Sequence, residues 1–401
     1  MRFSSTFNSL ILLVCLSLIS IRSFAFSDQV RVSILTCDKG EEVYTAFGHS
    51  AIRFVDPKDD VDIIYNYGVF RFGKSIPLFV SKFLKGNLQY RLKKELFNRF
   101  KQGYVKENRS IYEQELNLNA HQIDSMYRFL EINKLPENQY YTYDFLNQNC
   151  TTKITDILAS IVGKPLDYQV KKGDDFTFRE KVSETTNDYP WLSFVLDFIQ
   201  GRKTDRILNK TERLSLPFAL YEGLKDSFIQ SGTGNEPLIK KTAVIYKSKA
   251  TVSTIWLTPL SVMWFLFITS LFVTILKLKS IARLIDFTLF TLTGIIGTIL
   301  YITWAISYHE GFSFHMNALW LLPTNLLAGL FLLIAPTHKW LKYYFLNVSL
   351  LFIIALAYYL FHTNEFNAAI LPLLLICILR GLTLKGNKFS LLQEIKQAWK
   401  A

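Results

Sequence analysis

Phe47-Gly48-His49-Ser50-Ala51-Ile52-Arg53 joins the end of a polar loop to a strand pattern and places a histidine at the junction. Further along, Asn147-Gln148-Asn149-Cys150-Thr151-Thr152 leads from an aromatic extended segment into a helical pattern. A cysteine at a helix N-terminus faces unpaired N–H groups and the positive end of the helix dipole, which favour the thiolate. Such a nucleophile needs a base, and the two residues need only meet in the folded chain. We therefore predict Cys150 as nucleophile and His49 as base.

A third polar group is expected to orient the imidazole of His49 through its second ring nitrogen. Strands are predicted over residues 30–35, 50–55 and 62–70, so the strand after His49 is the natural source of that group. Its polar members are Asp62 and Asn66. We favour Asn66, because Tyr65-Asn66-Tyr67-Gly68 resembles a fixed structural motif, and keep Asp62 as the alternative.

The remaining patterns predict a strand over residues 110–116 and helices over 77–88, 94–102, 120–134 and 151–162. The histidine precedes the cysteine, whereas papain-like enzymes usually present the cysteine first. The fold class expected here is therefore an α+β domain with a circularly permuted version of the papain-like fold. The backbone N–H of Cys150 would help to bind an oxyanion, with the side chain of Asn149 or Tyr44 in support.

Cysteine usage leaves one alternative open. Cys15 lies in an apolar N-terminal run and Cys377 in an apolar C-terminal run, so Cys37 and Cys150 remain. In an oxidising compartment these two could form a disulfide, and the domain would then be a non-catalytic scaffold. A helix start such as Asn149-Cys150-Thr151-Thr152 is a poor site for a buried structural disulfide. This favours the interpretation of Cys150 as the nucleophile.

The ends of the chain indicate a membrane protein. Residues 1–25 have a short basic start, an apolar run and small residues at a cleavage position, as in a signal peptide. Residues 26–249 mix charged and aromatic residues without a long apolar run, so we expect one soluble domain with a helical extension. From residue 250 to residue 401 the chain is mostly apolar and is expected to be a membrane domain. Its apolar runs, each a candidate helix across a core of ~30 Å, are residues 255–276, 285–306, 316–335, 343–361 and the shorter 368–379.

The loops between these five runs predict the orientation. Lysine and arginine follow the first, third and fifth runs, whereas residues 307–315 and 362–367 contain neither. Because basic loops stay in the cytoplasm, the C-terminus is expected there, and residues 26–249 on the opposite side of the membrane. The formal net charge of +12 arises partly from this bias. The basic residues of the soluble part suit an anionic phospholipid surface, and nucleic acid is not expected as a partner outside the membrane.

The non-basic loop around residues 308–317 offers further polar groups. Four residues in or next to this loop are candidates for binding a substrate head group or amine: His309, His315, Asn317 and Trp320. The alternative is that they belong to an interfacial belt of residues at the membrane surface. Two histidines supply too few ligands for a metal site, so no metal and no cofactor is expected.

These motifs together resemble the Lnb-type lipoprotein N-acyltransferases. The resemblance rests on Tyr44-x-x-Phe47-Gly48-His49, Tyr65-Asn66-Tyr67-Gly68, Tyr143-Asp144-Phe145 and Asn149-Cys150-Thr151-Thr152, and on Asn317-x-x-Trp320-x-x-Pro323 in the membrane part. It implies a periplasmic domain similar to the NlpC-type and lecithin–retinol acyltransferase-like branch of the papain superfamily. It also implies Cys150 as nucleophile and His49 as base.

The activity that the resemblance implies is a two-step acyl transfer. An acyl chain would pass from a membrane phospholipid to Cys150 as a thioester, and then to the N-terminal amine of a diacylglyceryl-cysteine lipoprotein. The competing interpretation is a membrane-anchored NlpC-type cell-wall peptidase or amidase, which would use the same dyad with water as acceptor.

Overall fold

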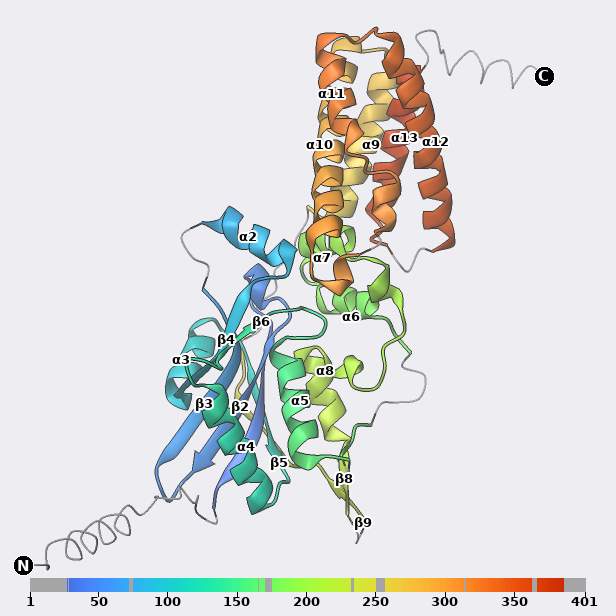
Figure 1. The fold of residues 1–401 in the computed structure, drawn as a ribbon. Coiled ribbons are helices and arrows are strands. Elements are labelled where there is room, and N and C mark those ends of the chain that lie inside the picture. The colour runs from blue at the N-terminus through green and yellow to red at the C-terminus, as the bar shows by residue number, and fades with distance from the viewer. Residues whose placement is uncertain are drawn as a thin grey trace, which may run out of the picture.

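The computed structural model describes residues 27, 29–71, 75–164, 166–169, 175–231, 234–249, 257–313, 315–362 and 366–385. The expected signal peptide lies outside these residues. Figure 1 shows a sheet-containing N-terminal domain below an elongated bundle of helices that forms the C-terminal part. The expected succession of a mixed α and β domain and a helical region with apolar helices is thus confirmed.

The N-terminal domain is built on one antiparallel sheet. Its strands, in the described residues, are β1 Arg31–Cys37, β2 His49–Asp56, β3 Val61–Val69, β4 Gln89–Leu96, β5 Ile111–Leu116, β6 Tyr140–Thr142 and β10 Ile239–Tyr246. They lie in the order β10-β5-β1-β2-β3-β4-β6. In the register of β1 and β2, Cys37 pairs with His49, so the predicted base lies at the end of a central strand.

Both faces of the sheet are covered, because neighbouring residues of each strand point to opposite sides. Ile34 and Phe54 belong to one apolar cluster with residues of α4 Ala120–Asn133 and α5 Cys150–Val162. Their neighbours Leu35 and Ala51 belong to a second cluster with residues of α3 Phe97–Lys106. The alternation fixes which side chains of β2 and β3 can reach the start of α5.

The sequence-based boundaries failed in two places. The helix expected over residues 94–102 is the end of β4 followed by α3, because the basic residues 93 and 94 conceal the strand alternation. Residues 231–235, whose glycine and serine content is typical of a flexible linker, instead include the end of β8 Phe228–Ser231 and the start of β9 Gly234–Pro237. These two strands pair with each other, and β8 also pairs with β7 Leu166–Asp167. The chain then returns along β10 to the main sheet beside β5 before it reaches the apolar part.

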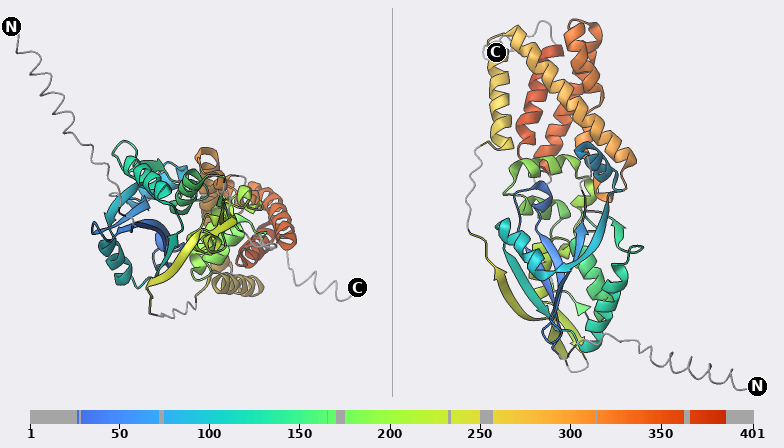
Figure 2. Two further views of the ribbon diagram at one scale, coloured as in Figure 1. Left: turned by 90° about the horizontal axis from the view of Figure 1, so that it is seen from below. Right: turned by 90° about the vertical axis from the view of Figure 1, so that its left-hand side faces the viewer.

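Three further helices of the N-terminal half connect the sheet to the C-terminal part. They are α6 Phe178–Thr185, α7 Pro190–Ile199 and α8 Pro217–Lys225. Figures 1 and 2 place α6 and α7 directly under the bundle. Phe194 and Phe198 of α7 belong to the same apolar cluster as Trp320 of the C-terminal part. The segment after α7 forms two backbone hydrogen bonds with the C-terminal part, from Gly201 N to Gly311 O at 2.7 Å and from Arg202 N to Ser313 O at 3.1 Å.

The C-terminal part consists of α9 Pro259–Ile275, α10 Lys279–Ile306, α11 Thr324–Ile334, α12 Lys339–Phe361 and α13 Ile370–Lys385. Among the described residues, α10 and α12 are long and apolar enough to cross a membrane. The short 3-10 helices η4 Glu310–Phe312 and η5 Met316–Leu319 form with α11 a third candidate, which is bent by 41°. Helix α9 has 17 residues and at 1.5 Å per residue is ~26 Å long, just short of the ~30 Å hydrocarbon core. The count of five spans therefore stays a prediction.

Candidate active site

His49 begins β2 and has a fixed ring orientation. Its Nε2 lies 2.6 Å from Oδ1 of Asn66 on β3. An amide oxygen only accepts, so Nε2 carries a proton and Nδ1 is left with its lone pair. The sulfur of Cys150 lies close enough to this imidazole for the two groups to shift each other's pKa, and Nδ1 is the nitrogen that remains to accept the thiol proton. The structure therefore brings Cys150, His49 and Asn66 together in the order expected for a thiol, its base and an orienting group.

Asn66 is itself held in place. Its Nδ2 donates to Oε1 of Glu95 on β4 at 3.4 Å, which leaves Oδ1 turned toward His49. Glu95 also accepts from Lys93 at 2.7 Å. Sequence reasoning missed Glu95, because it depends on the pairing of β3 with β4, and that strand was not foreseen.

The alternative third group, Asp62, is engaged elsewhere. Its two carboxylate oxygens each accept from the guanidinium of Arg53 at 2.8 Å. The structure thus places Asn66, and not Asp62, against the imidazole of His49.

Cys150 is the first residue of α5, as the sequence indicated. The side chain of Asn149 caps this helix, with Oδ1 accepting from the N–H groups of Thr151 and Thr152 at 2.8 and 3.0 Å. Its Nδ2 donates to the backbone oxygens of Phe145 and Ser215. Both ends of the amide are therefore used, and the expectation that Asn149 helps to bind an oxyanion is wrong in this geometry. Asn149 instead positions the start of α5.

The electrostatics of the pair favour a reactive thiol. Burial raises the pKa of Cys150. The charge and hydrogen bond of His49 and the backbone N–H of Ser50 lower it by more than burial raises it, so that the pKa is about 7. Burial lowers the pKa of His49, and the charge and hydrogen bond of Cys150 outweigh this and raise it. The thiolate and imidazolium stabilise each other. Cys37 contrasts with this, because burial raises its pKa to about 12.

The three described cysteines, Cys37, Cys150 and Cys377, are all free thiols. The disulfide between Cys37 and Cys150, on which the scaffold alternative depends, is not formed.

Gly68 lies beside the pair in a backbone conformation that favours glycine. Its φ is +85°, whereas a methyl group built at this position would be in ordinary van der Waals contact, 3.5 Å from Cβ of Cys150 and 3.6 Å from Cε1 of His49. The motif Tyr65-Asn66-Tyr67-Gly68 therefore supplies both the orienting amide and the glycine that this backbone conformation favours beside the pair.

Aromatic residues surround the sulfur on the side of β4 and β6. The rings of Tyr90 and Tyr143 stack with centroids 4.2 Å apart. Burial raises the pKa of both hydroxyls, and the negative charge of Cys150 raises them further, which indicates that both lie near the sulfur. Tyr44, the other expected oxyanion residue, is half-exposed and packs edge-on against Phe70 at 5.7 Å.

The candidates of the membrane loop make contacts between the two parts of the chain. His309 is buried, with Nδ1 2.7 Å from the carboxylate of Asp144 and Nε2 2.9 Å from the backbone oxygen of Phe83. Both ring nitrogens are thus used in fastening the two halves of the chain. Asn317 donates to the backbone oxygen of Asp197 and accepts from the indole of Trp320, so these two residues also hold the junction. His315 is buried beside the backbone of Phe312 and Gln200.

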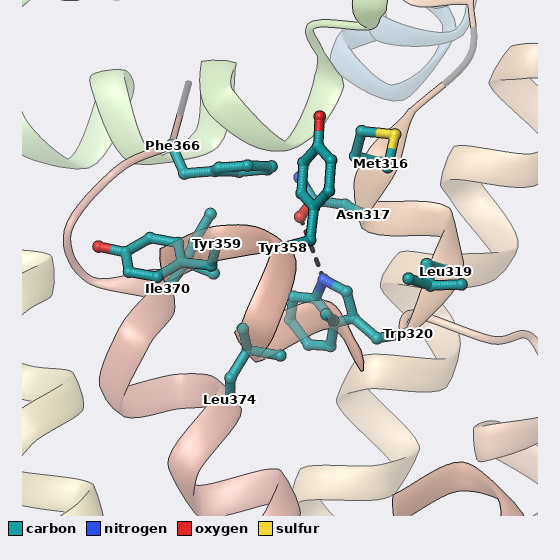
Figure 3. Close-up of a pocket in the computed structure, with 10 residues that line it drawn as sticks. Met316, Asn317, Leu319, Trp320, Tyr358, Tyr359, Phe366, Ile370 and Leu374 are labelled. Atoms are coloured by element: carbon teal, nitrogen blue, oxygen red, sulfur yellow. Dashed lines mark hydrogen bonds between the residues drawn. The ribbon is translucent and has the colours of Figure 1, made fainter. Parts of the chain in front are cut away.

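A small pocket does open next to Asn317 and Trp320. Figure 3 shows it between η5, α12 and α13, and its lining consists of Met316, Asn317, Leu319, Trp320, Ala355, Tyr358, Tyr359, Phe366, Ile370 and Leu374. Neither His49 nor Cys150 lines it. In the described part of the chain, no three His, Cys, Asp or Glu side chains are grouped so that they could hold a metal ion.

Comparison with known proteins adds two matches. Residues 22–180 match the family model of the Lnb N-terminal periplasmic domain, and residues 250–386 match that of the Lnb transmembrane domain. No curated protein and no solved structure matches the chain.

Proposed function

Because this chain belongs to the Lnb family and is a membrane protein with an extracytoplasmic domain, we propose that it is a lipoprotein N-acyltransferase of the bacterial inner membrane. Its acyl donor is a membrane phospholipid, and its acceptor is the free α-amine of a diacylglyceryl-cysteine lipoprotein. Both substrates are lipids of the leaflet that faces the periplasm. The C-terminus lies in the cytoplasm, which the basic loops of the membrane part support.

The proposed fold of the N-terminal domain is a permuted papain-like one. In support, the base and its orienting amide lie on neighbouring strands β2 and β3, and the nucleophile follows them at the start of α5. A helix start that carries the thiol and a sheet that carries its base are what this chemistry requires, in whichever order the chain visits them.

In the first step, the thiolate of Cys150 attacks the carbonyl carbon of a phospholipid ester. The C–O bond breaks, His49 gives its proton to the leaving oxygen, and a lysophospholipid departs. The Asn149 cap uses the N–H groups of Thr151 and Thr152, so that of Cys150 remains for the oxyanion, beside the N–H of Ser50.

In the second step, the lipoprotein amine attacks the thioester carbonyl. His49, now neutral, takes the proton of the attacking nitrogen, the C–S bond breaks, and the thiolate returns. Asn66 keeps the imidazole oriented through both steps by accepting from Nε2. Exclusion of water matters here, because a thioester that meets water is hydrolysed.

The observation that carries the proposal is the polar contact chain Cys150–His49–Asn66 in a domain fastened to membrane helices. A soluble cell-wall hydrolase needs no such junction, whereas an enzyme with two lipid substrates must hold its thiol at the membrane. The bonds of His309 to Asp144 and Phe83 and the packing of α7 on the bundle supply this arrangement.

The proposal is tested in a host whose lipoproteins depend on this protein for N-acylation. Mass spectrometry of lipoprotein N-termini should show loss of the third acyl chain with Cys150→Ser and with His49→Ala. Cys37→Ser, at the other thiol of the domain, is the matched control and should retain it. Acylated N-termini in the Cys150→Ser host would overturn the proposal, and cleaved cell-wall peptides without acyl transfer would favour the hydrolase.

A further inference from the structure

Helix α2 Ile76–Lys85 is attached to the membrane part by its last turn. The backbone oxygen of Lys85 accepts from Tyr308 N at 2.9 Å, and that of Phe83 accepts from the ring of His309. The helix ends at Gly86, where φ is +70° and an added methyl group would lie 3.0 Å from His309 N. Because residues 308 and 309 directly follow α10, these contacts fix α2 at the level where a membrane-crossing helix ends. Figure 1 and the right-hand view of Figure 2 show α2 beside that end of the bundle.

The outer surface of α2 combines apolar and basic side chains. Leu78 is 57% exposed and Val80 is 45% exposed. Lys82 and Lys85 lie in its last turn, and both are exposed. The surface continues onto the end of α10, where the side chains of Ile302, Ile306 and Tyr308 are exposed. Apolar residues beside lysines at this depth match the boundary between acyl chains and anionic head groups.

The inner side of α2 begins a row of rings that leads to the sulfur. Phe79 packs on Phe70 with centroids 5.4 Å apart, Phe70 packs on Tyr90 at 5.0 Å, and Tyr90 stacks on Tyr143. The negative charge of Cys150 raises the pKa of Tyr90 and Tyr143, and also that of Tyr141, whose ring centroid lies 6.4 Å from that of Tyr90. These packed rings extend from α2 toward the thiol. They offer an apolar surface along which a hydrocarbon chain can lie.

We propose that α2 is a membrane-binding lip, whose Leu78 enters the outer face of the bilayer while Lys82 and Lys85, one and two turns further along the same helix face, contact lipid phosphates. The acyl chain of the donor then reaches Cys150 along Phe79, Phe70 and Tyr90. This second statement rests on the proposed function, whereas membrane binding by α2 does not. The occupant of the exposed surface is lipid because the surface is continuous with α10 and carries the charge that complements anionic head groups.

Membrane binding is tested first, without reference to activity. Full-length protein carrying Leu78→Cys on a Cys150→Ser background is labelled with an environment-sensitive fluorophore and placed in phosphatidylethanolamine–phosphatidylglycerol nanodiscs. The label should be quenched by nitroxide-bearing phospholipid. Ile132→Cys on α4, where the native side chain is 59% exposed, is the matched control and should not be quenched. Equal quenching at both positions, or no quenching at position 78, would overturn the proposal that α2 binds the membrane.

The donor path is tested with Leu78→Glu in vesicles, with Ile132→Glu as control. Acylation of Cys150 by bilayer phospholipid should fall about tenfold or more, since burial of one apolar side chain contributes ~1.5–3 kcal/mol. Acylation by a water-soluble short-chain ester should stay at the wild-type rate. An unchanged rate with bilayer phospholipid contradicts the path, and a loss with both esters assigns α2 to the integrity of the site. Wild-type protein that takes an acyl group from neither ester would instead contradict the proposed function.

Discussion

Nδ1 of His309 lies 2.7 Å from the carboxylate of Asp144. The histidine belongs to the loop that follows α10, and the aspartate to the loop that leads into Cys150. Asp144 also accepts from the N–H groups of Leu146 and Asn147, so it shapes that loop. One hydrogen bond therefore links the position of the thiol to the end of a membrane helix.

The first prediction concerns this link. His309→Phe should lower the melting temperature and reduce acyl transfer, because it leaves the buried carboxylate of Asp144 without its partner. The hydrogen bonds of His309 and of the backbone hold the pKa of Asp144 below its usual range, although burial opposes them. The stability that the ionised Asp144 gives the folded protein is therefore fully present above the pKa of this carboxyl in the unfolded state. It is lost as the pH falls through the pKa of the carboxyl in the folded state. Thermal melts from pH 7 to pH 3 should show a smaller loss for His309→Phe than for wild type. The same fall in both would contradict the role, and His121→Phe on the exposed side of α4 is the control.

The second prediction separates Asn66 from Asp62. Asn66→Ala should reduce kcat by ~10²-fold or more while KM stays near the wild-type value, since an unoriented imidazole is a poor base. Glu95→Gln should have a smaller effect of the same kind, because it weakens only the support of Asn66. Asp62→Asn changes the ion pair with Arg53 and should leave kcat within a few-fold of wild type. A kinetic loss with Asp62→Asn that equals the loss with Asn66→Ala would reverse this assignment.

The third prediction uses the thiol itself. The rate of alkylation of Cys150 by iodoacetamide should rise with pH and reach half its maximum near pH 7, the pKa that His49 sets against burial. In His49→Ala only burial and the weaker hydrogen bonds remain, so the midpoint should move up toward or beyond the ordinary thiol value of 9.0. Peptide mass spectrometry distinguishes Cys150 from Cys37, which should stay unlabelled below about pH 9. An unchanged midpoint in His49→Ala would show that the pair does not interact.

The fourth prediction concerns the junction near α7. The guanidinium of Arg179 is bonded to Asp205 at 2.5 Å and lies 3.6 Å from Asp197, and all three side chains are largely buried. Arg179→Met should destabilise the chain by about 3–5 kcal/mol, because both carboxylates are left buried without a cation. Chemical unfolding in detergent measures the effect. Lys181→Met on the same helix, whose ion pair with Glu184 is more exposed, should change stability by less than about 1 kcal/mol.

The sequence predicted the chemical groups of the site better than their surroundings. His49 and Cys150 were identifiable because a strand start and a helix start have local signals, and Asn66 because it stands on the next strand. Glu95 was not identifiable, because its contact with Asn66 depends on the pairing of β3 with β4. Lys93 and Lys94 interrupt the alternation of apolar and polar residues by which β4 would be recognised. The role of His309 was also beyond reach, because it depends on how two separately predicted parts dock, and no local pattern records that contact.

Whether Cys150 carries an acyl group between two lipids is tested by trapping the acyl-enzyme. Full-length protein in phospholipid vesicles without acceptor is quenched in acid, digested and analysed by mass spectrometry. We expect a hydroxylamine-sensitive acyl mass on the peptide containing Cys150, which disappears when a diacylglyceryl lipopeptide with a free amine is added. N-acylated lipopeptide formed without acyl-Cys150, and formed equally by Cys150→Ser, would contradict this role of Cys150.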